Sequence, residues 1–249
     1  MSMQSGKYCF ILIVCVILFA VPMVRASSSI QGGGNFTLGF PQGEFHENVD
    51  NLGYGFSLFG FYHTTGSFLN VGLAFNYLIY GHETREEPWS KTIPDVFVDV
   101  TTTNSILYGH LMLRITPHSG IVRPYIDGLF GFGSFTTSTE VKNQEYDDDD
   151  DKTIASTTHL RDSAVNYGFG GGLLIRVFDA SGEKEEELEA VSIQLGVRYL
   201  KGGVAKYMKE GSIEIDDNGN LHYDIHESET GIVTVHLGIV LDFTFPIPQ

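Results

Sequence analysis

The chain has 249 residues, with 31 acidic against 15 basic side chains and a formal net charge of −16 at pH 7. This excess of negative charge argues against nucleic acid as a partner. The 29 glycines, 18 phenylalanines and 12 tyrosines favour β-structure over helix, and the length suits one domain behind an N-terminal signal.

The N-terminus predicts a secretory signal peptide over residues 1–26. Lys7 precedes an apolar run from Cys9 to Val24, and cleavage after Ala26 releases the mature chain. The alternative is a membrane anchor, because a bilayer-spanning helix needs at least about 17 apolar residues and this run is close to that limit. Both cysteines of the chain fall inside the signal, so we expect no disulfide in the mature protein.

Segments in which bulky apolar residues alternate with small or polar ones recur along the mature chain. In the clearest of them, residues 69–79, bulky side chains occupy every odd position, while the even positions are mostly glycine, alanine and asparagine. The pattern predicts eight strands, at residues 33–41, 52–62, 69–79, 98–116, 122–136, 165–177, 191–199 and 233–245.

The connections between these segments alternate in length. Short ones fall at residues 63–66, 117–120 and 179–189, and long ones at residues 42–51, 81–97, 137–160 and 201–228. Short turns on one side and long loops on the other are typical of transmembrane barrels. No later stretch has twenty apolar residues, so a helical membrane protein is excluded.

The second face of the strands separates this pattern from a soluble sheet. It carries glycine, asparagine, serine and glutamine with few charges, which suits the narrow interior of an eight-stranded barrel. The bulky face then meets lipid, and the first and last strands must pair, because an unpaired backbone group in hydrocarbon costs several kcal/mol. So tight an interior argues against an open porin. The soluble alternative is a lipocalin-like barrel.

Four segments resemble the outer-membrane β-barrel family that contains the small OmpA-like and OmpX-like barrels: residues 123–135, 166–178, 192–203 and 234–245. The resemblance covers nearly all of residues 27–249. It implies an all-β, eight-stranded antiparallel up-and-down transmembrane barrel in the outer membrane of a Gram-negative bacterium, with short periplasmic turns and long extracellular loops. It also implies a monomer that meets outer-membrane lipid, lipopolysaccharide and the barrel assembly machinery. Family members end on an aromatic residue, whereas this chain runs past Phe245 to Gln249.

Single charges on the inward face are the first candidate site. We expect a polar network in the lumen, with Gln194, His110 and His236 nearby, formed by Arg114, Asp127, Arg176, Arg198 and Asp242. Such a network would plug the lumen. The alternative is structural packing alone, because buried charges need partners whether or not they control passage.

A second candidate is a run of five acids that could bind calcium through carboxylate oxygens: Asp147, Asp148, Asp149, Asp150 and Asp151. EF-hand loops place their acids at alternate positions around a glycine, and this run is unbroken. A solvated, mutually repelling segment is therefore the favoured interpretation. No cofactor is expected.

The nine histidines form no recognisable triad or metal spacing, so we expect no catalytic activity. The predicted function is a structural, adhesive or surface-interaction role carried by acidic extracellular loops. The alternatives are a lipid A-modifying enzyme and a barrel that lets a small hydrophobic ligand pass sideways into the bilayer.

Overall fold

The computed structural model describes most of the mature chain: residues 28–64, 67–90, 93–117, 119–143, 153–180, 188–215 and 221–245. The predicted signal, residues 1–26, lies outside these ranges. So does the acidic run from Asp147 to Asp151, and nothing that follows depends on the structure of either.

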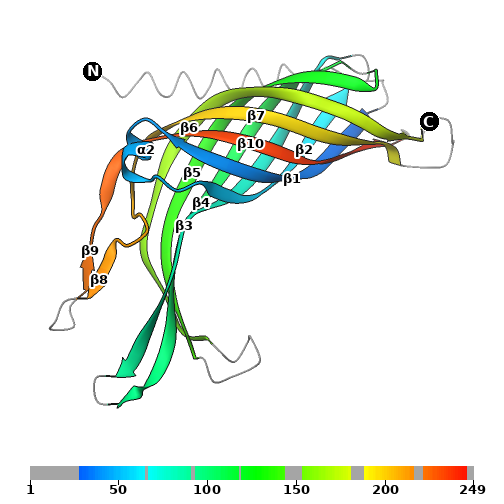
Figure 1. The fold of residues 1–249 in the computed structure, drawn as a ribbon. Coiled ribbons are helices and arrows are strands. Elements are labelled where there is room, and N and C mark those ends of the chain that lie inside the picture. The colour runs from blue at the N-terminus through cyan, green and yellow to red at the C-terminus, as the bar shows by residue number, and fades with distance from the viewer. Residues whose placement is uncertain are drawn as a thin grey trace, which may run out of the picture.

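Eight long antiparallel strands close into one barrel, as predicted (Figure 1). Around the barrel the order is β1-β10-β7-β6-β5-β4-β3-β2. Their bounds are β1 Ser28–Gln42, β2 Gly53–Thr64, β3 Leu69–Ser90, β4 Ile93–Ile115, β5 Val122–Asn143, β6 Thr153–Asp179, β7 Leu188–Tyr207 and β10 His226–Phe245. Strands that lie side by side in the barrel are therefore also consecutive barrel strands along the chain, apart from the closing pair β1 and β10.

The first strand pairs with the last along the whole of β1 and closes the barrel. Their register runs from Ser28 opposite Phe245 to Gln42 opposite Gly231. This continuous ladder satisfies the backbone groups of both strands, which would otherwise form two open edges.

Side chains alternate between lumen and exterior along every strand, as β7 illustrates. From Ala190 to Tyr199 each even-numbered residue is buried in the lumen, and most odd-numbered ones are exposed. Strand geometry requires this, since successive side chains point to opposite faces. Glycine at inward positions makes room: a Cβ on Gly196 would overlap the hydroxyl of Tyr125.

Four strands continue well past their neighbours at the end of the barrel that carries the long connections. β2 pairs with β3 only as far as Tyr54 opposite Ile79, and β7 pairs with β6 only as far as Gly202 opposite Asn166. Beyond these points the four strands between them remain paired and form what we call the projecting sheet (Figure 1): residues 80–90 of β3, 93–105 of β4, 136–143 of β5 and 153–165 of β6.

The projecting sheet corrects two predicted loops, at residues 81–97 and 137–160. Most of both ranges is strand. Sequence alternation weakens there because, past the lipid, both faces of the sheet meet water. Threonine and serine then replace the contrast between greasy and small side chains.

The remaining elements lie in the two other long connections. Helix α2, Glu44–Asn48, joins β1 to β2, and the short hairpin of β8, Ile213–Ile215, and β9, Leu221–Tyr223, lies between β7 and β10. Across the described residues, no helix combines the length and apolarity needed to cross a membrane.

Candidate functional site

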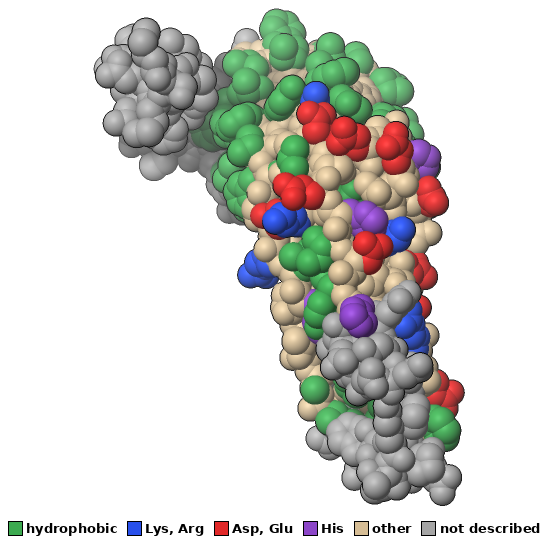
Figure 2. Space-filling model, turned by 90° about the vertical axis from the view of Figure 1, so that its left-hand side faces the viewer, with side chains coloured by type: hydrophobic (Ala, Val, Ile, Leu, Met, Phe, Trp, Pro, Cys, Tyr) green, Lys and Arg blue, Asp and Glu red, His purple; other side chains and the backbone are tan. Residues whose placement is uncertain are grey.

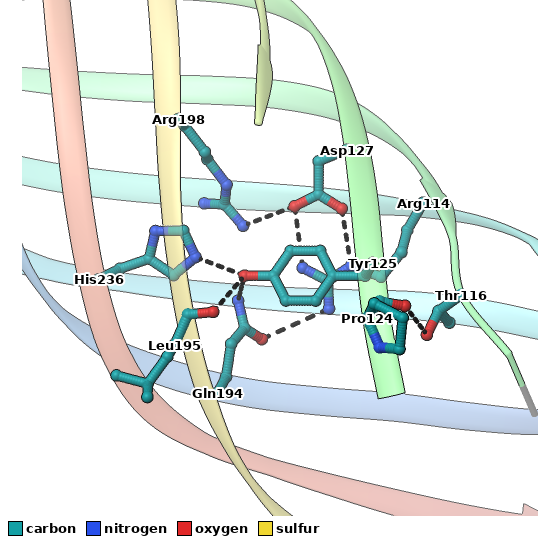
Figure 3. A network of polar contacts seen from close by, with 9 residues as sticks. All are labelled: Arg114, Thr116, Pro124, Tyr125, Asp127, Gln194, Leu195, Arg198 and His236. Carbon is teal, nitrogen blue, oxygen red and sulfur yellow. Dashed lines mark hydrogen bonds and ion pairs between the residues drawn. The ribbon is translucent and has the colours of Figure 1, made fainter. Parts of the chain in front are cut away.

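A buried ion cluster lies across the lumen, toward the end with the short turns (Figure 3). The guanidinium of Arg114, on β4, donates to both carboxylate oxygens of Asp127 on β5, at 2.7 and 2.9 Å. Arg198, on β7, donates to the same carboxylate at 3.2 Å. Because both Arg114 and Asp127 are completely buried, this bidentate pair is held where an unpaired charge would cost most.

Aromatic rings surround the same guanidinium. The Cζ atom of Arg114 lies 4.0 Å from the ring centre of Tyr125, 4.5 Å from that of Phe61 and 5.6 Å from that of Phe59. The faces of these rings stabilise a cation that has left water. The cluster therefore fills the lumen with packed rings as well as with charges.

The hydroxyl of Tyr125 extends the network across the barrel (Figure 3). It donates to the carbonyl oxygen of Leu195 at 3.3 Å and accepts from Nε2 of Gln194 at 3.1 Å. It also lies 2.9 Å from Nε2 of His236, and Oε1 of Gln194 accepts from Arg114 at 3.4 Å. Strands β4, β5, β7 and β10 are thus tied together through the lumen.

A second ion cluster involves Asp242 on β10. Its two carboxylate oxygens accept from Arg123 at 3.0 Å and from Nε2 of Gln31 at 2.6 Å. Arg123 also donates to the hydroxyl of Ser192 at 3.2 Å. This cluster joins β1, β5, β7 and β10 and is separate from the contacts around Asp127.

The opposite end of the lumen is closed by helix α2. Phe45 points inward, is completely buried, and packs against three aromatic rings from three strands. Its ring centre lies 4.9 Å from that of Tyr207, 5.7 Å from that of Tyr80 and 5.9 Å from that of Phe135. All three contacts are edge-to-face, the arrangement that aromatic pairs favour.

Polar contacts fix this aromatic plug. Asn48 of α2 donates to the hydroxyl of Tyr207 at 3.0 Å, and that hydroxyl lies 2.7 Å from Oγ of Ser228. The hydroxyl of Tyr80 donates to the carbonyl oxygen of Met208 at 3.0 Å. Side chains therefore close the lumen at two levels, aromatic near the long loops and ionic near the short turns.

Outside the barrel, large apolar side chains face the surroundings. Leu73 is 56% exposed, Phe169 68% and Leu237 53%, although each alternates with less exposed neighbours. Figure 2 shows such side chains gathered over the barrel, with acidic ones collecting beyond them. A greasy exterior around a polar, closed interior is the arrangement that a bilayer imposes on β-structure. The chain has the fold of a transmembrane β-barrel. In outer-membrane barrels the short turns face the periplasm and the long connections lie outside the cell.

Comparisons with known proteins add no closer relative. No protein-family model and no curated protein matches the chain. Three solved structures with a similar strand arrangement are distant from it in sequence. A major outer-membrane protein of Thermus thermophilus has 16% identity and a TM-score of 0.38, covering 89% of this chain and 100% of that one. Neisserial surface protein A has 9% identity and a TM-score of 0.36, with 88% of this chain and 97% of that one covered. The Yersinia pestis protein Ail has 14% identity and a TM-score of 0.28, with 89% of this chain and 100% of that one covered.

The structure brings together three of the five lumen residues singled out from the sequence: Arg114, Asp127 and Arg198. Asp242 also faces inward but pairs with Arg123. The prediction was wrong for Arg176. Its guanidinium donates at 2.7 Å to Asp179, three residues along β6, in a half-exposed contact near the short turn.

The two histidines expected near the network take different places. His236 contacts Tyr125, whereas Nε2 of His110 lies 2.6 Å from Oδ1 of Asn166 and the His110 ring stacks on Tyr108. His110 is thus held apart from the ion clusters by its own partners. Across the described residues, no group of three His, Cys, Asp or Glu side chains could hold a metal ion.

Sequence reasoning missed Arg123, Tyr125 and the plug residue Phe45. Arg123 could have been found, since it shares the odd-numbered face of its strand with Asp127. Tyr125 shares that face too, but a bulky ring is expected to point to lipid. Phe45 lies in a connection where no periodicity marks an inward side chain.

Proposed function

We propose that this outer-membrane barrel is a surface-interaction protein. The closed barrel is the membrane anchor, and the projecting sheet, with the acidic connections around it, is the part that meets a partner. The proposal assigns no chemical reaction to the barrel.

The continuation of four paired strands beyond the lipid is the observation that carries this proposal. On β3 the extra strand runs from Tyr80 to Ser90, roughly 35 Å at about 3.3 Å per residue. An anchor alone needs strands of only about 9–11 residues. Ordered backbone on this scale outside the membrane costs conformational entropy, so a rigid exterior surface implies a use for it.

The projecting sheet holds itself together without lipid. Hydroxyl groups meet across its strands, at 3.1 Å between Thr84 and Thr101 and at 2.9 Å between Thr102 and Thr139. Cross-strand threonine pairs of this kind contribute to sheet stability. A stiff, water-tolerant sheet suits recognition of a partner better than a set of unpaired loops would.

The closed lumen argues against transport. The aromatic plug around Phe45 and the ion cluster around Asp127 fill the lumen at two levels. The wall is also continuous, since every strand of the barrel pairs with both of its neighbours. Sideways release of an apolar ligand therefore has no support in the geometry.

A variant with shortened hairpins tests the proposal. Gly81 pairs with Asn104 and Thr137 with Leu160, so a two-residue turn can replace the chain between the members of each pair. In lipid nanodiscs, we expect binding to at least one member of a panel of immobilised extracellular proteins, weakened tenfold or more in this variant.

The matched control shortens the connection between β7 and β10 instead. The backbone of Asp224 donates to the carbonyl oxygen of Ser212 at 2.9 Å, so these two residues can be joined directly. This control should bind like the full chain. Equal binding by the variant without the projecting sheet, or no binding by the full chain to any panel member, would contradict the proposal.

A further inference from the structure

The projecting sheet has two outer edges, and its β6 edge is open. β5 pairs with β6 as far as Thr153, whereas the pairing of β7 with β6 begins only at Asn166. Near the barrel β7 still contacts this edge, because the carboxylate of Asp162 accepts the backbone N–H of Lys206 at 2.7 Å. Further out, the described strands offer β6 no partner on that side.

The open part of this edge faces solvent. All five side chains from Ile154 to Thr158 are exposed, on both faces of the strand. The next residue, His159, is an extra residue in the register with β5, and its ring lies against Tyr223 of β9. The exposed edge therefore ends where the β8–β9 hairpin begins to touch the sheet.

The opposite edge, on β3, is protected. Glu83 accepts the backbone N–H of Gly211 at 3.0 Å, and Arg85 donates to the carbonyl oxygen of Ile213 at 3.1 Å. Pro88 follows further along the same strand and has no N–H to offer. Charged residues, proline and a covering loop are the usual means by which proteins block an edge.

Within the described part of the chain, no charge, proline or covering loop blocks the β6 edge between Ile154 and Thr158. Bulges bound this run, because Ile154 and His159 are each an extra residue in the register with β5. Its sequence is Ile-Ala-Ser-Thr-Thr, with neither charge nor proline. Unpaired backbone groups on an exposed strand are a template for one more strand. The difference between the two edges of one sheet indicates that the β6 edge is kept available.

We propose that this β6 edge, Ile154 to Thr158, binds an extended segment of a partner protein by strand addition, and that lysine or arginine flanks that segment. The inference rests on the proposed surface-interaction function and specifies where and how it acts. Backbone hydrogen bonds provide the attachment, and the outward side chains contact alternate residues of the added strand.

Charge decides in favour of a basic segment over a second copy of this chain. The five acids from Asp147 to Asp151 precede β6 in the sequence, separated from it by Lys152 alone, and the whole chain carries a net charge of −16. Two copies meeting at this edge would bring two acidic runs together. A basic segment is attracted to the same region, and its association should weaken with salt.

A blocked seven-residue peptide, Lys-Thr-Val-Thr-Val-Thr-Lys, is a direct probe of the edge. We expect it to bind the full chain in nanodiscs and to slow hydrogen exchange at those alternate amides between Ala155 and Thr158 that point to the open edge. Replacing both lysines by glutamate should weaken binding at least tenfold. Methylating the backbone nitrogens on one side of the peptide should abolish binding, because those donors form the ladder.

Proline substitutions test the edge from the side of the protein. Successive N–H groups of a strand point to opposite sides, so only one of Ser156→Pro and Thr157→Pro removes a donor from the open edge. One of them should therefore abolish binding while the barrel keeps its heat-modifiable migration. Glu86→Pro, on the protected β3 edge, is the matched control and should leave the affinity within twofold.

The outcomes separate this inference from the function beneath it. If peptide binding survives both β6 proline variants but is lost with the shortened hairpins, the inference about the β6 edge is wrong. The projecting sheet then remains the binding surface. If shortening the hairpins leaves binding unchanged, both the inference about the β6 edge and the proposed function of the projecting sheet are wrong. Self-association of the full chain that these proline variants abolish would replace the basic segment by a second copy. No binding of the peptide by the full chain also overturns the inference.

Discussion

Asp127 and Arg114 face each other across adjacent strands and share two hydrogen bonds, at 2.7 and 2.9 Å, with no solvent on either side chain. Their register places them directly opposite on β5 and β4. A cross-strand pair thus becomes the centre of the lumen network, because Arg198 adds a third bond to the same carboxylate. The pair links sequence alternation to closure of the barrel.

Asp127→Asn should destabilise the barrel by roughly 3–5 kcal/mol, because it leaves two buried guanidinium groups with one carboxylate fewer. Urea unfolding in lipid vesicles measures this loss. Asp179→Asn breaks the half-exposed pair with Arg176 and is the control, expected to cost about 1 kcal/mol or less. Similar losses for the two variants would show that the network does not stabilise the barrel.

Phe45→Ala should remove the aromatic plug and cost roughly 3–5 kcal/mol, the range for truncating a buried phenylalanine. Loss of protection against a glutamate-specific protease at Glu44 and Glu47, both in α2, should accompany the loss of stability. Phe97→Ala is the matched control, since Phe97 lies half-exposed on β4 outside the plug and should change stability by about 0.5 kcal/mol at most. A neutral Phe45→Ala would mean that helix α2 is held by its polar contacts alone.

Gly196→Ala should disturb the contact between Tyr125 and His236, since the added Cβ would overlap both the tyrosine hydroxyl and Nε2 of the histidine. The barrel should unfold at lower urea concentration, and the imidazole resonances of His236 should shift. Gly60→Ala is the control, because nothing lies within 4 Å of a Cβ at that outward position. If both variants behave like the parent chain, the lumen is looser than the structure indicates.

Asp162 should give the exterior a pH dependence. Backbone N–H groups of Lys206 and Ser163 hydrogen-bond its carboxylate and lower its pKa. A lowered folded-state pKa means that this contact stabilises the fold above the ordinary pKa of about 3.9 and is lost as pH falls through the folded value. The protection of the Lys206 amide, relative to its intrinsic exchange rate, should then fall in acid, and Asp162→Asn should flatten that dependence. An amide exchange rate with no acid-dependent increase beyond its intrinsic chemistry would contradict the assignment.

The sequence predicted the barrel well because lipid and lumen make opposite demands on alternate residues. Leu73 and Ala74, adjacent on β3, are 56% and 2% exposed, as the alternation required. The pattern fails where those demands end. In the projecting sheet both faces meet water, so Thr101 and Thr102 carry no contrast and the sequence does not distinguish this outer strand from a loop.

The lumen site was only partly predictable, because strand parity gives the face of a residue but not its partner. Parity placed Asp127 and Asp242 inside the barrel. Which arginine reaches each of them depends on the stagger of strands around the closed barrel, and this assigned Arg123 to Asp242 and left Arg176 outside the network. Aromatic residues that face inward, such as Tyr125, break the rule that bulky side chains meet lipid.

Spin labels on single cysteines at adjacent positions test the orientation on which everything else depends. The chain has no cysteine after Cys15, and both Cys9 and Cys15 lie in the predicted signal. In proteoliposomes, labels at Leu73 and Leu237 should be accessible to oxygen dissolved in the bilayer and shielded from a water-soluble nickel complex, while a label at Ala74 should be shielded from both. Labels at Leu73 and Leu237 relaxed by the nickel complex and not by oxygen would contradict the membrane barrel itself.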